Sequence, residues 1–396
     1  MLANQLHVVV AAFLSGLGAV TSGCAAQSPS PAEHHSAVSL PRATRTGSSQ
    51  DEIVSVRQLW TEYLASKHGK LASNAGTASP LWLDSEQARR PMYDLAGFYV
   101  PDGAVPQSVR IQPARAGGAH AYEIVTRFSP AGSKSADSGS AVVLTMTVYG
   151  VRDKGQWVLA NTLPRKTAAW RREDVGQITY LVEPGLAFNR QKAQRAAAFV
   201  DSLATAFAVP PIGRLDYYVT SSVDAALSIL GVEFPVKYGP TGGFSKPVNR
   251  QLFSGLPSLG EEYRHELTHV VLRPLLEGGT MTILASEGVA TWLGGTEGGD
   301  FRGSVRNLAS YLAAHPEVSL DSIMDVASTP QSVRYSTGAV LCAMLFDAGG
   351  TQAIKGFLSA GPGSSQLRAL LVRALRRPWA TVVSDWRATV VRITST

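Results

Sequence analysis

The feature that most constrains the fold of this sequence is the run His265-Glu266-Leu267-Thr268-His269. Histidines four positions apart lie on the same face of an α-helix, with their Cβ atoms roughly 5–6 Å apart. A helix through this run therefore lets both imidazoles bind one metal ion. Glu266 would then lie beside the ion, where a carboxylate can accept a proton from a bound water molecule.

A second glutamate completes the pattern. Glu287 follows His269 by eighteen positions, within the segment Ser286-Glu287-Gly288-Val289-Ala290-Thr291-Trp292. With His265 and His269 it would form a His₂Glu set, which leaves the fourth position of a tetrahedral zinc ion open for water or substrate. The sequence therefore predicts one Zn²⁺ per chain, held by His265, His269 and Glu287, in a site of the catalytic kind.

The flanking residues predict two helices joined by a reversal of the chain. Glu261 and Glu262 suit the first turn of the first helix, and Pro274 prevents that helix from continuing. Gly278-Gly279 then breaks the chain, and a second helix is expected from Met281 to Leu293. This arrangement would bring the second glutamate back against the first helix.

This stretch resembles the gluzincin metallopeptidases, in particular the peptidase MA-like group related to aminopeptidase N. That family carries HExxH followed by a W-L-x-E-G-x-A-type helix that supplies the third zinc ligand, here Glu287. Trp292 falls after the glutamate, and Ala285-Ser286 stand where the family often has Trp-Leu and a small residue, a departure that touches no ligand. The resemblance covers roughly residues 175–395 and implies a zinc-dependent hydrolase of peptide bonds with Glu266 as general base.

Two further segments match the same family. Tyr335-Ser336-Thr337-Gly338 resembles its Tyr-x-x-Gly segment, which implies that Tyr335 stabilises the oxyanion of the tetrahedral intermediate. Thr241-Gly242-Gly243-Phe244, followed by Asn249 to Phe253, stands where the family has an edge strand along which the peptide substrate lies. The Gly-x-Met-Glu-Asn segment of the aminopeptidases is absent, so the choice between exo- and endopeptidase stays open.

One alternative from another class also stays open. The chain could be a catalytically inactive zinc-binding scaffold, or an envelope-binding lipoprotein, that uses the same ligands without turnover. A peptidase requires Glu266 for its function, whereas a binding module would tolerate the loss of this residue. Hydrolysis of a non-peptide bond at the same zinc ion is a third possibility that the sequence leaves open.

The N-terminus has the pattern of an export signal. Val8 to Val20 is an apolar run of thirteen residues, the length of a signal-peptide core and too short to span a bilayer. It ends in Thr21-Ser22-Gly23-Cys24, which resembles a bacterial lipobox and implies a lipidated Cys24 after removal of residues 1–23. Residues 24–50, rich in Ser, Pro and Ala, are expected to be a disordered tether to the membrane. The alternative is a conventional signal peptide and a secreted or periplasmic protein.

Composition limits the remaining function classes. A chain of 396 residues favours two domains. Its net charge of +6 is scattered, with no basic stripe interleaved with aromatic residues, so nucleic acid is not an indicated partner. The expected partners are a peptide or protein substrate and the membrane.

If Cys24 is lipidated, no disulfide can form, because Cys342 is the only other cysteine. It lies in an apolar helical run and is expected to be a buried core thiol.

Residues 51–172 have a different pattern from the zinc region. An amphipathic helix is expected from Ile53 to Ser66. Strands are expected at Ser108 to Gln112, Tyr122 to Phe128, Ala141 to Val151 and Gln156 to Asn161, with a hairpin turn at Asp153-Lys154-Gly155. A helix followed by a curved antiparallel sheet is the element order of nuclear transport factor-like (cystatin-like) domains, which this region resembles.

Residues 175–396 are expected to form the metallopeptidase domain. Its first half reads as an α/β lobe with strands at Ile178 to Val182 and Leu215 to Val219, and helices at Asn189 to Phe207 and Val223 to Leu230. Its second half reads as helical, at Arg302 to Ala314, Thr337 to Phe346, Gln366 to Arg376 and Thr381 to Arg392. The predicted fold class is therefore α+β, and the gluzincin resemblance implies a zinc ion at the junction of the two lobes.

Overall fold

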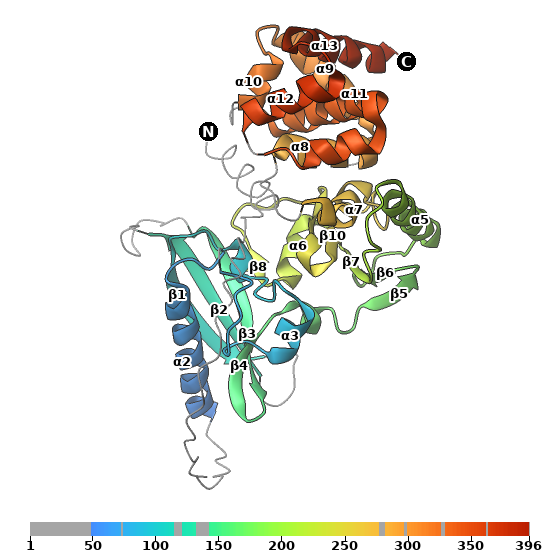
Figure 1. The fold of residues 1–396 in the computed structure, drawn as a ribbon. Helices are drawn as coiled ribbons and strands as arrows, with labels where there is room; N and C mark the ends of the chain where they lie inside the picture. The colour runs from blue at the N-terminus through green and yellow to red at the C-terminus, as the bar shows by residue number, and fades with distance from the viewer. Residues whose placement is uncertain are drawn as a thin grey trace, which may run out of the picture.

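The computed structural model describes residues 49–72, 74–114, 121–131, 142–276, 282–296, 299–325, 329–361 and 363–395. The expected signal peptide, Cys24 and nearly all of the expected tether lie outside these residues, as does the expected break at Gly278-Gly279. No helix in the described part is long and apolar enough to cross a membrane. The described chain is α+β, as the sequence predicts (Figure 1).

The first part of the fold is a long helix packed against an antiparallel sheet. Helix α2 (Ser49–Lys67) buries Val56, Trp60 and Tyr63 in the core beneath it. The helix lies so close to the sheet that a β-carbon added at Gly150 would be 2.8 Å from Val56 Cγ1. The strands follow the order β1 (Ala104–Pro113), β2 (Ala121–Pro130), β3 (Leu144–Asp153), β4 (Gln156–Ala160), each antiparallel to the next.

The hairpin predicted between β3 and β4 is confirmed. The turn residues Lys154 and Gly155 both have positive φ, of 50° and 84°. Positive φ at both central positions is the signature of a type I′ turn, whose twist matches that of the flanking strands. The four expected strands of this region all form, and β1 and β2 extend beyond the predicted limits.

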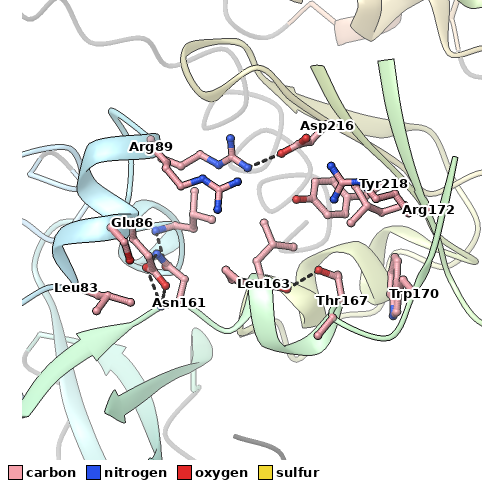
Figure 2. A pocket seen from close by; sticks show the side chains of 16 residues that line it. Leu83, Glu86, Arg89, Asn161, Leu163, Thr167, Trp170, Arg172, Asp216 and Tyr218 are labelled. Atoms are coloured by element: carbon pink, nitrogen blue, oxygen red, sulfur yellow. Dashed lines mark hydrogen bonds and ion pairs between the residues drawn. The ribbon is translucent and has the colours of Figure 1, made fainter. Parts of the chain in front are cut away.

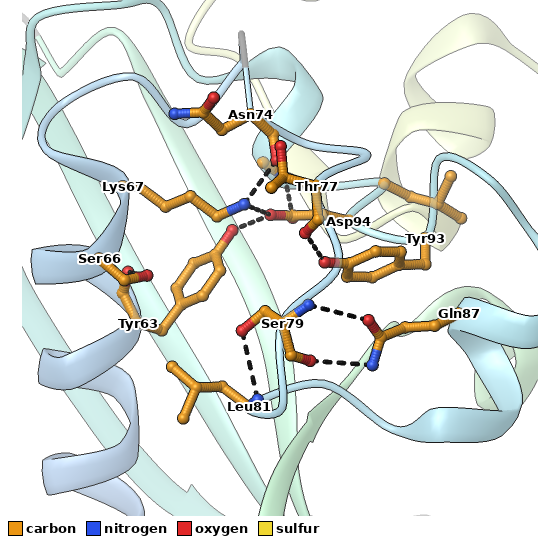
Figure 3. A network of polar contacts seen from close by, with 12 residues as sticks. Tyr63, Ser66, Lys67, Asn74, Thr77, Ser79, Leu81, Gln87, Tyr93 and Asp94 are labelled. Atoms are coloured by element: carbon orange, nitrogen blue, oxygen red, sulfur yellow. Dashed lines mark hydrogen bonds and ion pairs between the residues drawn. The ribbon is translucent and has the colours of Figure 1, made fainter. Parts of the chain in front are cut away.

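A buried polar network fastens α2 to the segment that follows it (Figure 3). Asp94, which is fully buried, accepts hydrogen bonds from Tyr63 Oη and, at 3.0 Å, from the Gly97 backbone nitrogen. Lys67 Nζ lies 3.9 Å from the same carboxylate and donates to the Asn74 carbonyl at 2.5 Å. Burial raises the pKa of Asp94 well above its usual range. This network holds the loop after α2 under the sheet.

The second sheet is mixed and ends in a short edge strand. Its order is β5 (Arg171–Val175), β6 (Ile178–Val182), β7 (Leu215–Val219), β10 (Gln251–Ser254), β9 (Gly243–Lys246). The β6–β7 and β7–β10 pairs are parallel, and the β5–β6 and β10–β9 pairs are antiparallel. Strands β6 and β7 have the predicted bounds. Helix α5 (Arg190–Ala206) begins where predicted, because the Asn189 side chain accepts a hydrogen bond from the Lys192 nitrogen.

The two sheets are joined by a chain connection and a shared core. Strand β8 (Val232–Glu233), which follows helix α6 (Val223–Ile229), returns to the first sheet and pairs with β3. Tyr218 and Phe253 of the second sheet stack on each other, with ring centroids 4.6 Å apart, inside the core that also contains Trp60 and Trp82. The first part of the chain is therefore packed against the second through a continuous apolar interior.

The rest of the described chain is helical. The helices are α7 (Arg264–Val271), α8 (Ile283–Gly294), α9 (Phe301–Ala314), α10 (Leu320–Asp325), α11 (Gln331–Leu358), α12 (Ser364–Leu375) and α13 (Trp379–Ser395), with shorter segments α3 (Asp84–Arg89) and α4 (Leu163–Lys166) in the first part. Cys342 is fully buried in α11, as predicted. Helix α11 begins at Gln331, six residues before the predicted start, and is interrupted at Gly349 and Gly350.

The expected start of the first zinc helix is wrong. Glu261 and Glu262 precede α7, which begins at Arg264. Both carboxylates are used elsewhere: Glu261 is buried and accepts a hydrogen bond from the Asn189 nitrogen at 2.7 Å, and Glu262 forms ion pairs with Arg195 and Arg264. Tertiary contacts to α5 therefore fix these glutamates, and the favourable interaction of acidic residues with a helix N-terminus does not decide their place.

Candidate metal centre

Helices α7 and α8 bring the three predicted ligands together. The Nε2 atoms of His265 and His269 lie 3.3 Å apart. Glu287 Oε2 lies 3.1 Å from His265 Nε2 and 3.5 Å from His269 Nε2. The first helix presents both imidazoles on one face, and the second places its carboxylate between them. The i, i+4 spacing therefore puts both histidines on one face of α7, and the second helix brings Glu287 back against them, as the sequence predicts.

These three distances fit one tetrahedral zinc ion. Zinc bonds of 2.0–2.1 Å with tetrahedral angles place neighbouring donor atoms about 3.3–3.4 Å apart. The observed separations of 3.1, 3.3 and 3.5 Å bracket this value. Two imidazoles and a carboxylate are also donors that zinc prefers. A second carboxylate is close, since the ligand atoms of His265, Glu266 and His269 lie within 4.8 Å of one another. The contacts of Glu287 with the two histidines, at 3.1 and 3.5 Å, favour Glu287 over Glu266 as the third ligand.

A backbone carbonyl orients the first histidine. His265 Nδ1 lies 2.8 Å from the Gly295 carbonyl oxygen, so Nδ1 carries the proton and Nε2 is free to bind metal. The end of α8 reaches this point because of two glycines. A β-carbon added at Gly294 would lie 2.4 Å from the His265 nitrogen, and Gly295 has a φ of +75°. The role of this carbonyl does not follow from the sequence, although the Gly294-Gly295 pair is a signal of a close approach between two backbones.

The three predicted ligands are mostly buried, with His269 the most exposed of them, and their charges are coupled. His265 and Glu287 are 4% and 5% exposed. Burial disfavours the charged form of His269, but the adjacent Glu287 carboxylate outweighs it and raises the pKa of His269 to about 9. Burial likewise opposes ionisation of Glu287, yet the two histidines bring its pKa well below the usual range. The charges of the two side chains are therefore strongly coupled, which suits side chains that bind one metal ion together.

Glu266 points to the edge strand of the second sheet. Its side chain is buried, and its Oε2 atom accepts a hydrogen bond of 2.7 Å from Ser245 Oγ on β9. This bond uses one carboxylate oxygen and leaves Oε1 able to accept a proton. The sequence predicts a strand at this place, but it gives no signal that the Ser245 side chain belongs to the site.

Tyr335 of α11 lies against His265. Its ring stacks on the His265 imidazole, with centroids 6.1 Å apart and an interplanar angle of 23°. Its hydroxyl accepts a hydrogen bond from Gln331 Nε2, one helical turn earlier. Burial and the nearby Glu287 carboxylate raise the pKa of Tyr335 well above its ordinary value. The hydroxyl therefore keeps its proton and is able to donate it in a hydrogen bond.

The five residues singled out in the sequence thus meet in one place: His265, Glu266, His269, Glu287 and Tyr335. They come from α7, α8 and α11, which are separated by up to 70 positions in the chain. Comparison with protein-family models and with curated proteins gives no significant match to this chain.

Proposed function

We propose that the chain is a zinc metallopeptidase of gluzincin type, exported and tethered to the cell-envelope membrane through Cys24. The observation that carries the proposal is the convergence of His265 Nε2, His269 Nε2 and Glu287 Oε2 at 3.1–3.5 Å, beside a carboxylate that is not needed as a ligand. A structural zinc site has four protein ligands, whereas three ligands and a neighbouring base are the plan of a hydrolytic one.

The residues present suit each role that hydrolysis requires. Zinc held by the three ligands would polarise a carbonyl group and lower the pKa of a water molecule. Glu266 Oε1 would accept the proton of that water and pass it to the leaving amine. Ser245 holds the other oxygen of Glu266 and so fixes the direction of the carboxylate. Tyr335, whose ring stacks on His265, would donate a hydrogen bond to the oxyanion.

The edge strand suits an extended substrate. Among the described residues, strand β9 is the last strand of its sheet and pairs with β10. The edge strand of a sheet is the place where an extended peptide can add as a further strand. Because Ser245 of this strand contacts Glu266, a peptide added along β9 would pass next to the general base. A mixed lobe before the site and a helical lobe after it are the arrangement that the gluzincin resemblance implies.

The inactive scaffold remains the second candidate, and one substitution separates it from the enzyme. Glu266→Gln should keep about one zinc ion per chain, because this residue is not a ligand. Its hydrolysis of a mixed-peptide library, measured by mass spectrometry, should fall by about 10²–10⁴-fold, the range for a lost general base. Glu287→Ala should lower zinc affinity and activity together. Wild-type protein that binds zinc but cleaves no peptide would favour the scaffold.

A further inference from the structure

A second site lies away from the metal centre, where the first part of the chain meets the second sheet (Figure 2). It is a pocket of about 400 Å³, lined by residues of α3, α4 and strands β5, β6 and β7. This volume is within the range of roughly 300–1,000 Å³ that is typical of small-molecule sites. The three zinc ligands, Glu266 and Tyr335 are not among its lining residues. The pocket is therefore separate from the proposed reaction centre.

Three arginines line this pocket, and only one of them is neutralised by a neighbour. Arg90 of the segment after α3 forms an ion pair with Asp216 of β7. Within the described residues, the guanidinium groups of Arg89 and Arg172 make no ion pair. In Figure 2, Arg89 extends from α3 on one side, and Arg172 extends from β5 on the other. Two cationic groups without carboxylate partners thus face the same space.

The carboxylates of the pocket do not cancel this charge. Asp216 is paired with Arg90. Glu86 accepts hydrogen bonds from the Asn161 backbone nitrogen at 3.0 and 3.1 Å and from its side chain at 2.5 Å, so its lone pairs are already used. Burial raises the pKa of Glu86 to about 7, against weaker opposing effects of Asn161 and nearby arginines. The pocket therefore carries a net positive charge at neutral pH.

The remaining walls are apolar or can donate a hydrogen bond. Leu163 is buried and lies at the middle of the pocket in Figure 2, and Trp170 lies at its edge, beyond Thr167. Burial raises the pKa of Tyr218 to about 12, so its hydroxyl remains protonated. Figure 2 shows this hydroxyl directed into the space between the two sides. A few placed polar groups above an apolar floor are the usual composition of a site for a small organic molecule.

We propose that this pocket binds a small organic anion. Its carboxylate or phosphate group would lie between the Arg89 and Arg172 guanidinium groups, which match such anions in shape as well as in charge. Its apolar or aromatic part would pack on Leu163 and Trp170. The proposal does not depend on the metallopeptidase assignment, because the two sites share no residue.

Strand β7 connects this site with the base of the first zinc helix. Asp216 and Tyr218 line the pocket, whereas Tyr217 between them faces the other side of the sheet. Tyr217 Oη donates to the Gly260 carbonyl at 2.7 Å and accepts from the Tyr263 nitrogen at 3.0 Å, immediately before α7 begins. The pocket and the start of α7 therefore both contact strand β7.

Titration calorimetry with two aromatic anions and one neutral isostere tests the site. Benzoate represents a carboxylate, phenyl phosphate represents a phosphate, and benzamide has the shape of benzoate without its charge. We expect saturable binding of at least one anion, with no binding of benzamide, and the stronger anion identifies the class of ligand. Arg89→Gln and Arg172→Gln should each weaken the binding about 10- to 100-fold, the effect of one charge-assisted hydrogen bond of about 1.5–3 kcal/mol.

A matched control lies on the same strand. Arg171 is exposed, forms an ion pair with Glu173 at 2.8 Å and does not line the pocket, so Arg171→Gln removes the same charge without touching the site. This variant should bind the anion with wild-type affinity. Ala168 lines the pocket from an exposed position, and Ala168→Trp should block binding by filling the space. Failure of both anions to bind, equal binding of benzamide, or equal affinities in the Arg89, Arg172 and Arg171 variants would overturn the proposal.

Discussion

Gly288 of α8 and Gly338 of α11 meet at a crossing where the two backbones are in contact. A β-carbon added at Gly288 would lie 2.5 Å from the Gly338 carbonyl carbon, and one added at Gly338 would lie 2.0 Å from the Leu284 carbonyl oxygen. Gly288 follows Glu287, the predicted ligand, and Gly338 lies one turn after Tyr335. The crossing of these two glycines therefore sets the position of the tyrosine relative to the ligand.

Replacement of Gly338 by alanine should damage the site from a distance. The added methyl group clashes with backbone atoms, which cannot move aside as a flexible side chain can. The free energy of unfolding should therefore fall by about 1–3 kcal/mol. Activity should fall further than stability explains, because α11 would move Tyr335 away from His265. Chemical denaturation and peptide hydrolysis measure the two effects. Gly356→Ala, in the same helix with no atom within 4 Å of the added carbon, is the control and should be neutral or slightly stabilising.

Tyr335→Phe tests the oxyanion role directly. The hydroxyl is proposed to act only on charge that develops in the transition state, so kcat should fall by about 10²–10³-fold with little change in KM. The ring still stacks on His265, so zinc content should be unchanged. If the variant turned over peptide at the wild-type rate, Tyr335 would have no part in the reaction.

The common face of the two histidines can be predicted from the sequence because it follows a local rule. The i, i+4 spacing of His265 and His269 determines their common face once a helix forms, and no long-range contact is needed for that. Glu287 required an assumption about how two helices pack. The chain reversal expected from Pro274 and Gly278-Gly279 supplies that assumption, and the Gly288–Gly338 contact and the Gly295 carbonyl explain how the packing is achieved.

Other parts of the fold depend on contacts that no local pattern reveals. Glu261 and Glu262 were expected to lie in a helix, but contacts to Asn189 and Arg195 of a distant segment hold them outside it. Strand β8 is two residues long, too short for any periodicity, and it forms because it completes the first sheet. The anion pocket combines residues 80 or more positions apart, such as Arg89 and Arg172, each of which is unremarkable in its own segment.

Ser245→Ala should reduce activity without removing the metal. Ser245 Oγ donates to Glu266 Oε2 at 2.7 Å and touches none of the three ligands, so it acts as a positioning residue for the base. We expect a fall in kcat of roughly tenfold, the effect of about 1.4 kcal/mol in the barrier, with zinc content and KM nearly unchanged. Ser245→Thr keeps the hydroxyl and should restore most of the activity. A variant with alanine that lost zinc, or that worked as fast as wild type, would contradict this role.

Cys24→Ala should separate anchoring from folding. The residue lies outside the part of the chain that the structure describes. If Cys24 carries the lipid, its loss should move the protein from the membrane fraction to the aqueous fraction, with zinc content and thermal stability unchanged. Fractionation followed by N-terminal mass analysis gives the result. Wild-type protein that is soluble without detergent and begins after Cys24 would rule out the anchor.

Glu86→Gln should change how stability depends on pH. Burial raises the pKa of Glu86 to about 7 in the folded chain, from the ordinary 4.5, so the folded state holds this proton more tightly than the unfolded state. The stability that Glu86 contributes is therefore greatest below about pH 4.5 and is lost as the pH rises through 7. The full shift corresponds to at most about 3 kcal/mol, and to less where water enters the pocket.

Glutamine keeps an acceptor for Asn161 and cannot ionise, so Glu86→Gln should melt higher than wild type at pH 8 and should lose this advantage at pH 5. Glu62→Gln, at an exposed position of α2, is the control. If the difference in melting temperature between Glu86→Gln and wild type did not change with pH, Glu86 would titrate alike in the folded and the unfolded chain.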